Sequence, residues 1–364
     1  MVASASRLPS LALPDLYLCN TYRHLLMALA SIAAAERAAI VVYLEDEVPV
    51  PTALRARLAA ASPLTEFIFT TDAAQQKAFT RAPAWVSAVI RRNLSWHDGR
   101  FVSPFRWRSR LLAGRRFATG YVSHAGFFFS KVVAGLCARI VLRESGLNNY
   151  TALPVTPLKA VLRSVSGFSP FRQIWGEAAW ITQIEVARPQ DLPLRVRAKA
   201  VQNSFAQMMQ ALPAAQSQAL AQAFLDAPLP IFASPLPKAL LLSQPLEQIG
   251  MGDVAAKQAL YAELATELRR QGFQIYLKQH PREARFDLPD SLALPARFPI
   301  EAWPYCAAPR FDLAVAICSA ALDMGNNDFA KRNLQLVAVA DFNAPGYRVW
   351  RDALSSRLAG ALKQ

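Results

Sequence analysis

The sequence predicts an α/β fold made of two domains, each built around a parallel sheet. Short apolar runs typical of strands alternate with helix-like segments, and this alternation restarts in the second half of the chain. A proline-rich segment separates the two halves. At 364 residues the chain is long enough for two separate cores. We therefore expect two sheets that face each other across a cleft.

The first half shows the β-α-β order that builds a parallel sheet. Its expected strands cover residues 11–20, 39–44, 66–70, 119–123 and 139–142. A helix-like segment over 22–37 follows the first strand, and an Ala-, Gln- and Leu-rich stretch predicts another helix over 204–224.

The segment 225–237 has four prolines in thirteen residues, which predicts a stiff linker. We place the domain boundary there, with one domain over 1–230 and a second over 231–345. The expected elements of the second domain are strands at 239–243, 273–277 and 311–317 and a helix at 254–271. A helical segment closes the chain over 346–364, and packing back on the first domain is one arrangement expected for it.

The charge is strongly positive, with 40 Lys and Arg residues against 26 Asp and Glu residues. The excess concentrates at 81–116, where nine arginines and one acidic residue alternate with tryptophan and phenylalanine. An acidic polymer, nucleic acid or an anionic membrane would fit this segment, and a merely solvated basic surface is the simpler alternative. Interspersed aromatic residues favour the membrane surface, where arginine neutralises headgroups and tryptophan prefers the interface.

No stretch approaches the roughly 18 apolar residues of a membrane-spanning helix. The first fourteen residues lack the apolar centre of a secretion signal, so we expect a cytoplasmic protein. Its four cysteines have no paired spacing, which argues against both a disulfide framework and a zinc site.

A basic patch ends the predicted strand at 273–277. It reads Lys278-Gln279-His280-Pro281-Arg282, and Pro281 prevents a helical continuation, so the imidazole is expected at a strand end. Ligands bind at the strand ends of α/β sheets, and Lys278, His280 and Arg282 suit an anion. A plain turn is the alternative.

Two further patches in the second half could complete a nucleotide site. Glu301, in Pro299-Ile300-Glu301, offers a carboxylate that suits the hydroxyl pair of a ribose. Cys318 and Ser319 follow an apolar strand and precede a helix expected at Ala320, so a hydroxyl and free backbone amides could hold a phosphate there.

Together with Glu144, these patches resemble the bacterial transferases that depend on CMP-sialic acid, namely the lipooligosaccharide sialyltransferase family (glycosyltransferase family 52) and the bacterial polysialyltransferases. Those families carry an acidic-acidic-glycine motif, an HP motif, a proline-x-glutamate element and a Ser-Ser/Thr pair. The matching residues, in the same order, are Glu144-Ser145-Gly146, His280-Pro281, Pro299-Ile300-Glu301 and Cys318-Ser319. Ser145 replaces the second acid and Cys318 replaces the first serine.

The resemblance implies a GT-B fold, with an acceptor-side and a nucleotide-sugar-binding Rossmann-like domain. It also implies inverting transfer of sialic acid or a related ulosonic or nonulosonic acid to a bacterial surface glycan or glycolipid. Glu144 would deprotonate the acceptor hydroxyl, and His280 would bond to or protonate the departing CMP phosphate. Lys278, Pro281, Arg282, Glu301, Cys318, Ser319 and Ala320 would form the nucleotide site. His24, Asn149 and Tyr150 are weaker acceptor-side candidates, and Glu144 and His24 each have a capping role as the simpler explanation.

In this scheme the CMP-sugar is a substrate, no cofactor or metal is expected, and the enzyme works at the inner face of the cytoplasmic membrane without nucleic acid. Two other functions remain open: a teichoic-acid-like CDP-polyol phosphotransferase, and a non-enzymatic basic protein that binds polyanions.

Overall fold

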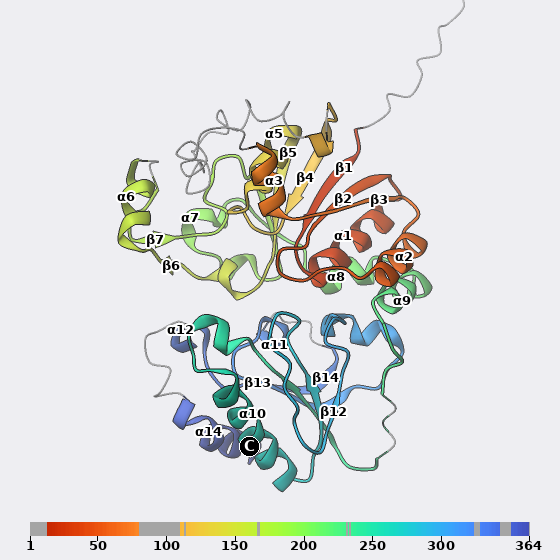
Figure 1. The fold of residues 1–364 in the computed structure, drawn as a ribbon, viewed down its shortest axis with the longest axis vertical. Coiled ribbons are helices and arrows are strands. Elements are labelled where there is room, and N and C mark those ends of the chain that lie inside the picture. Colours follow the sequence, from red (N-terminus) through yellow and green to blue (C-terminus); the bar gives the residue numbers. More distant parts are fainter. Residues whose placement is uncertain are drawn as a thin grey trace, which may run out of the picture.

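The computed structural model describes residues 13–79, 110–112, 114–165, 168–230, 232, 234–323, 328–342 and 351–363. Two parallel sheets organise these residues, one in each half of the chain. Figure 1 shows the two halves one above the other, with the first in red to green and the second in green to blue. Most of the segment predicted to bind a membrane, 81–109, lies outside the described residues.

The first sheet has seven strands in the order β3-β2-β1-β4-β5-β8-β9, and every pair is parallel. The strands are β1 (Asp15–Cys19), β2 (Ala39–Leu44), β3 (Thr65–Thr70), β4 (Phe117–Val122), β5 (Cys137–Arg143), β8 (Gln183–Val186) and β9 (Ala200–Gln202). All six residues of β2 are buried, as expected for a strand covered on both faces. The five strands predicted from the first half are therefore present.

The alternation of side chains along a strand distributes the first domain's core over two faces. Tyr17, Val41 and Tyr43 pack with helices on one face, whereas Leu18 and Val42 pack on the other. The helices of this half are α1 (Tyr22–Ala35), α2 (Thr52–Ala61), α3 (Asp72–Phe79), α5 (Phe128–Leu136), α6 (Pro157–Val165), α7 (Leu194–Arg197), α8 (Phe205–Gln210) and α9 (Ala214–Ala223). Short 3-10 turns lie at Arg110–Leu112, Leu147–Tyr150 and Pro189–Asp191, and β6 (Leu153–Pro154) pairs antiparallel with β7 (Arg172–Gln173).

The single helix predicted over 204–224 is wrong, because α8 and α9 divide this stretch. Pro213 lies at the start of α9 as its N-cap. A proline has no backbone N–H and its ring clashes with the preceding turn, so it does not continue a helix. Both helices lie against α1.

The second sheet has five parallel strands in the order β12-β11-β10-β13-β14. Its strands are β10 (Lys238–Leu242), β11 (Gln274–Lys278), β12 (Ser291–Ala293), β13 (Phe311–Ala316) and β14 (Ala330–Gln335). The helical elements are α10 (Val254–Arg270), α11 (Ala320–Asp323), α12 (Val339–Phe342) and α14 (Leu354–Leu362), with 3-10 helices η5 (Leu246–Ile249) and η6 (Ile300–Cys306). Asp253 caps α10 by accepting a hydrogen bond from the Ala256 amide at 2.7 Å.

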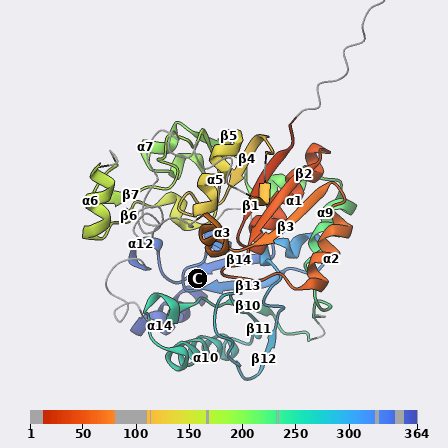
Figure 2. The same cartoon turned by 45° about the horizontal axis from the view of Figure 1, so that its top comes forward.

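The C-terminal helix does not pack on the first domain, contrary to one expected arrangement. Leu354 and Leu358 of α14 are buried in the core of the second domain with Leu260 and Leu264 of α10. Figure 2 shows α14 beside α10 on the outer side of this domain. The apolar face of α14 is therefore covered by α10, a helix of the same domain.

One apolar core joins the two domains. It contains residues of α1, α8 and α9 together with Tyr276, Trp303 and Phe311 of the second half. Phe205 of α8 meets Tyr305 of η6 edge to face, with ring centroids 6.2 Å apart. None of the described helices is long and apolar enough to span a bilayer.

Candidate functional site

The carboxyl ends of both sheets face the same space between the domains. Three contacts show this, and each joins the second domain to a residue shortly after a strand of the first sheet, in the first turn of α1 or in a loop. Arg23 pairs with Glu301, Glu47 pairs with Arg282, and Gly146 lies next to Ala320. The predicted patches of the two halves therefore approach each other, as ligand sites at strand ends require.

Glu144 follows β5 and is almost completely buried, with 1% of its surface exposed. One carboxylate oxygen accepts a hydrogen bond from the Tyr150 hydroxyl at 2.8 Å, and the other accepts one from the Ala187 amide at 2.8 Å. A carboxylate oxygen has two lone pairs, so each retains one acceptor position. The side chain is held in a single orientation and can still receive a hydroxyl proton.

The turn after Glu144 is shaped by Asn149. Its side-chain oxygen accepts hydrogen bonds from the amides of Ser145 and Gly146. Gly146 has a φ of 146°, a region that favours glycine. A Cβ atom at this glycine would lie 3.7 Å from the Ala320 side chain, so backbone conformation rather than space demands glycine here. Asn149 and Tyr150 thus both act on the Glu144 turn.

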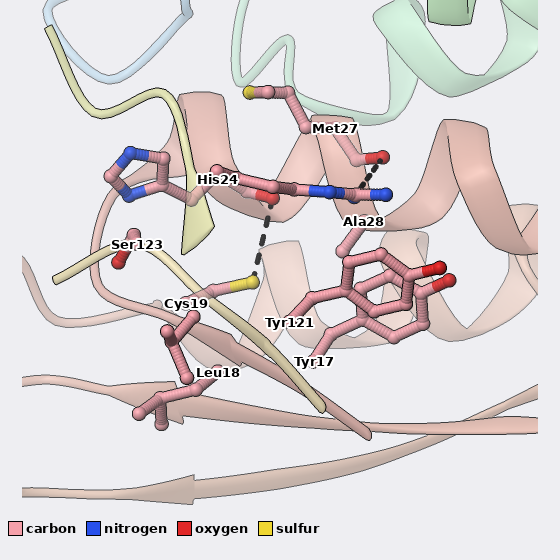
Figure 3. Close-up of a pocket in the computed structure, with 10 residues that line it drawn as sticks. Tyr17, Leu18, Cys19, His24, Met27, Ala28, Tyr121 and Ser123 are labelled. Atoms are coloured by element: carbon pink, nitrogen blue, oxygen red, sulfur yellow. Dashed lines mark hydrogen bonds between the residues drawn. The ribbon is translucent and has the colours of Figure 1, made fainter. Parts of the chain in front are cut away.

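His24 lies at the start of α1, behind the same turn. Its Nδ1 is 2.9 Å from the Asn20 side-chain oxygen, which also accepts from the Ser123 hydroxyl at 2.8 Å. The ring hydrogen-bonds the Glu144 backbone as well, but burial dominates and lowers the pKa of His24 to about 3. Figure 3 shows the imidazole above Ser123 and Cys19. His24 is a packed, neutral ring that supports Glu144.

Beneath the Glu144 turn, Arg143 anchors the end of β5. Its guanidinium pairs with buried Glu185 at 3.0 Å and lies 4.1 Å from the ring centroid of Tyr121. Tyr121 stacks on Tyr17 with centroids 4.5 Å apart, and Figure 3 shows the two parallel rings. This cluster fills the space behind the turn and keeps the strand end rigid.

His280 follows β11 and is partly buried. Its Nδ1 accepts a hydrogen bond from the Arg282 amide at 3.2 Å. Burial, with the positive charges of Arg282 and Lys278, lowers the pKa of His280 to about 3. A neutral imidazole whose Nδ1 is an acceptor carries its proton on Nε2. At neutral pH His280 is therefore a hydrogen-bond donor to an anion rather than an acid.

Lys278 is buried at the end of β11. Its ammonium donates to the carbonyls of Gln279 and Ala296 at 3.0 and 2.8 Å. Burial lowers the pKa of Lys278 to about 8, partly opposed by the negative charge of Glu301. Lys278 thus supplies positive potential from within the domain, with two of its three protons engaged by backbone.

Arg23 of the first domain connects the two halves of the site. Its Nη1 donates to the Glu144 carbonyl at 3.0 Å, and its Nε is 3.5 Å from a carboxylate oxygen of Glu301. Glu301 lies in η6, so Arg23 connects this helix of the second domain to the Glu144 turn. The sequence reasoning missed Arg23, although it precedes His24 in the same strand-end segment.

The expected phosphate site at Cys318 and Ser319 is occupied by side chains of the protein. The Cys318 amide donates to the Gln244 side chain at 2.9 Å, and the Gln244 amide donates back to the Cys318 carbonyl. The Ser319 amide donates to the Gln335 side chain at 3.2 Å. These two amides are not free, contrary to the expectation. The Ser319 hydroxyl oxygen accepts a hydrogen bond from the Ala321 amide at 3.3 Å.

Arg282 and Pro281 are exposed, beyond the strand end. The Arg282 guanidinium is 3.1 Å from a carboxylate oxygen of Glu47, and both side chains are more than a third exposed. Arg282 therefore connects the rims of the two domains. Among the described residues, no three His, Cys, Asp or Glu side chains group closely enough to hold a metal ion.

The sequence reasoning also missed Glu283, which lies three residues after His280. Its buried carboxylate accepts a hydrogen bond from the His280 amide at 2.7 Å. A carboxylate directly after a basic His-Pro turn was the available signal. The residues that shape both turns are thus polar groups close in sequence to the predicted ones.

A family model described as alpha-2,8-polysialyltransferase (POLYST) matches residues 122–327, more than half of the chain. No curated protein sequence matches the chain.

Two solved structures show a similar fold. One is a 2,6-sialyltransferase of Vibrionaceae Photobacterium sp. JT-ISH-224, bound to CMP and lactose, at 8% identity and a TM-score of 0.54. The alignment covers 96% of this chain and 76% of that one. The other is the GT-B domain of a Photobacterium damselae sialyltransferase, at 11% identity, a TM-score of 0.50 and 96% coverage of both chains. At these identities the likeness concerns the fold, and it confirms the predicted GT-B arrangement.

Proposed function

Because the chain belongs to the alpha-2,8-polysialyltransferase family, we propose that it transfers sialic acid or a related nonulosonic or ulosonic acid to a bacterial surface glycan or glycolipid. Family membership makes it a glycosyltransferase that depends on CMP-sialic acid. The comparisons give no support to a CDP-polyol phosphotransferase or to a non-enzymatic polyanion-binding protein. The acceptor, the stereochemistry and the residue roles below are the proposed part.

One observation carries the assignment of roles. Arg23 contacts the Glu144 turn and Glu301 at the same time, so the proposed base and the proposed ribose ligand lie on either side of one guanidinium. A base on the acceptor domain next to a nucleotide ligand on the donor domain is the arrangement that transfer between two substrates needs.

In the proposed reaction Glu144 accepts the proton of the acceptor hydroxyl as that oxygen attacks the anomeric carbon. The bond from this carbon to the phosphate oxygen breaks, and CMP leaves with the electron pair. Attack opposite the leaving group inverts the anomeric centre. The hydrogen bonds from Tyr150 and Ala187 keep the Glu144 carboxylate oriented for this single proton transfer. Because Glu144 is buried, this proposed step requires the contacts around its turn to open so that the acceptor can reach the carboxylate.

His280 is proposed to donate its Nε2 proton in a hydrogen bond to the departing phosphate. Its low pKa makes the neutral ring the resting form, and the negative charge of a bound phosphate would raise that pKa again. Lys278 adds positive potential from behind the strand end. Glu301 would exchange its contact with Arg23 for the ribose hydroxyls, and Ser319 would present its hydroxyl to the phosphate.

No metal enters this scheme. Lys278 would supply positive charge and neutral His280 a hydrogen bond, in place of the magnesium ion that neutralises a leaving phosphate elsewhere. We expect full activity in excess EDTA, measured as CMP release, whereas a loss that added Mg²⁺ restores would contradict metal independence.

We also propose a cytoplasmic enzyme that binds the inner membrane surface through the basic, aromatic segment 81–116. The protein should sediment with vesicles that contain phosphatidylglycerol and stay in solution with phosphatidylcholine alone. Equal binding to both vesicles would argue against an electrostatic membrane contact.

The nucleotide assignment is tested by calorimetric titration of the wild type and the His280→Ala variant with CMP. We expect CMP to bind the wild type and to bind the variant about tenfold more weakly, because one hydrogen bond to a charged group is lost. No CMP affinity in the wild type would refute the proposed nucleotide site. Incubation with candidate CMP-sugars and acceptors then identifies the transferred sugar by mass spectrometry.

A further inference from the structure

The turn that carries His280 is fixed by a buried ionic cluster that the proposed reaction does not use. The cluster consists of Glu283 in the turn, Lys257 in α10 and Glu247 in η5. The Lys257 ammonium is 3.2 Å from a Glu283 oxygen and 2.9 Å from a Glu247 oxygen. The side chains of Lys257 and Glu283 are completely buried. Burying charges in this way is costly, so it calls for a reason beyond stability.

Glu283 divides its two oxygens between the turn and the lysine. Oε1 accepts hydrogen bonds from the His280 amide, at 2.7 Å, and from the Ser243 hydroxyl, whereas Oε2 faces Lys257. Ser243 directly follows β10, the strand beside β11. One carboxylate therefore ties together the ends of two neighbouring strands and the first turns of α10.

The rest of the turn is held from the same side. Glu247 accepts a hydrogen bond from the Ala284 amide at 3.3 Å, Lys257 donates to the Ala284 carbonyl at 3.3 Å, and Gln248 donates to the Arg282 carbonyl. Backbone groups of Arg282 and Ala284, which follow His280, thus have defined partners. The one contact made to His280 itself from the cluster comes from Glu283.

This anchoring determines which ring nitrogen of His280 carries the proton. With the His280 backbone fixed, the Arg282 amide meets Nδ1 at 3.2 Å, and the ring proton must then be on Nε2. If the turn were free to rotate, Nδ1 could lose this donor and the two tautomers would compete. A hydrogen bond to a leaving phosphate needs the proton at one defined atom.

We propose that Glu283 is a positioning residue that holds the His280 turn so that Nε2 carries the imidazole proton toward the leaving phosphate. The inference rests on the proposed function of His280, and it identifies Glu283 as the residue that keeps the His280 proton on Nε2. Glu283 touches no substrate and acts through the His280 backbone.

The test begins with NMR of histidine side chains labelled with ¹⁵N. The chain has four histidines, so the imidazole signals can be assigned by comparison with His280→Ala. In the wild type we expect His280 to show an unprotonated Nδ1 and a protonated Nε2. In Glu283→Ala we expect a mixture of tautomers.

Kinetics of CMP release complete the test. Glu283→Ala should lower kcat about 10- to 100-fold while the KM for the acceptor stays within twofold, because misplacing one catalytic group affects the chemical step. Glu283→Gln keeps one oxygen for the His280 amide, so it should recover part of the tautomer order and part of kcat. It also serves if Glu283→Ala does not fold. The matched control is Glu267→Gln in α10, a carboxylate whose partners are Arg270 and Gln271, and it should leave the His280 signals unchanged.

A shifted tautomer together with a lower kcat supports the proposal. Unchanged His280 signals in folded Glu283→Ala and Glu283→Gln overturn it, and so does a shifted tautomer with normal kcat. If CMP leaves the wild-type His280 signals unmoved, the proposed function of His280 fails and the positioning role fails with it. That result is read from the wild type alone, so the two failures are distinguishable.

Discussion

The Glu144 turn follows β5 of the first domain and the His280 turn follows β11 of the second, and the protein holds the two turns in different ways. At Glu144 the side chain itself is held, by Tyr150 and the Ala187 amide. At His280 the backbone is held by Glu283, and the ring keeps its Nε2 proton for another partner.

The difference follows from the number of positions each group offers. A carboxylate has about four acceptor positions, so two can orient it while another receives a proton. A neutral imidazole has one donor and one acceptor, and using both for orientation would leave nothing for a ligand. A catalytic histidine must therefore be positioned mainly through its main chain.

Removing the proposed base should have the largest effect. We expect Glu144→Gln to lower kcat about 1,000-fold, because general base catalysis contributes roughly 10²–10⁴-fold. CMP affinity should stay within twofold, since the contacts of Glu144 lie in the first domain. Glu66→Gln is a matched control, because Glu66 is an exposed residue of β3 whose carboxylate pairs with Arg115 at the surface. Undiminished turnover in Glu144→Gln would remove Glu144 from the base role.

Acid should weaken the fold through buried His24 and partly buried His280. The pKa values of His24 and His280 are lowered to about 3, whereas an unfolded histidine titrates near 6.5. Below pH 6.5 the unfolded state binds protons that the folded state does not, so the stability present above 6.5 is lost as pH falls toward 3. Each histidine should contribute about 1.4 kcal/mol per pH unit to the slope of the unfolding free energy.

Urea unfolding between pH 4 and 8 measures this slope. Below pH 6, His24→Gln should lower the slope of the unfolding free energy against pH by the contribution of one histidine. Above pH 7.5 the slope should match that of the wild type. Identical slopes below pH 6 would mean that His24 is already protonated in the folded protein.

Arg23 tests the connection between the two turns. Arg23→Gln loses the contact with Glu301 and weakens the hold on the Glu144 carbonyl, so kcat/KM should fall about tenfold, as for one charged hydrogen bond. Arg37→Gln is the control, because Arg37 donates to the Leu13 carbonyl at an exposed site. Equal activity of the two variants would show that Arg23 does not couple the domains.

The rim pair of Arg282 and Glu47 should matter least. Both side chains are more than a third exposed, and such pairs contribute roughly 0–1 kcal/mol. A double-mutant cycle of Arg282→Ala and Glu47→Gln, read as kcat/KM at 0.15 M salt, should give a coupling below about 1 kcal/mol. A loss above tenfold in Arg282→Ala alone would instead indicate that Arg282 binds the nucleotide.

The local pattern of apolar residues was sufficient to predict the main strands. The run at 39–44 is uniformly apolar and the run at 311–317 is apolar apart from Asp312, because parallel strands are covered on both faces, and these runs appear as β2 and β13. Short edge strands such as β9 and β14 were not predicted, since at least half of the residues in each are exposed and neither contains an apolar run. These edge strands form only through pairing with the neighbouring strands β8 and β13.

The site divides in the same way. The positions of Lys278, His280 and Glu144 could be predicted because each lies at or just after the end of a strand, where ligands bind in α/β sheets. The role of Gln244 could not be predicted, because Gln244 lies 74 residues from Cys318, whose backbone it hydrogen-bonds. The engaged amides at Cys318 and Ser319 likewise depend on partners from other strand ends.

The sequence by itself determined the α/β class, the two-domain order and the family resemblance, because strand periodicity and short motifs are properties of neighbouring residues. Only the tertiary structure decided that Arg23 joins Glu144 to Glu301, that α14 packs on α10, and that buried Glu283 holds the His280 turn. These contacts connect residues through space, and burial sets their protonation, which no local pattern encodes.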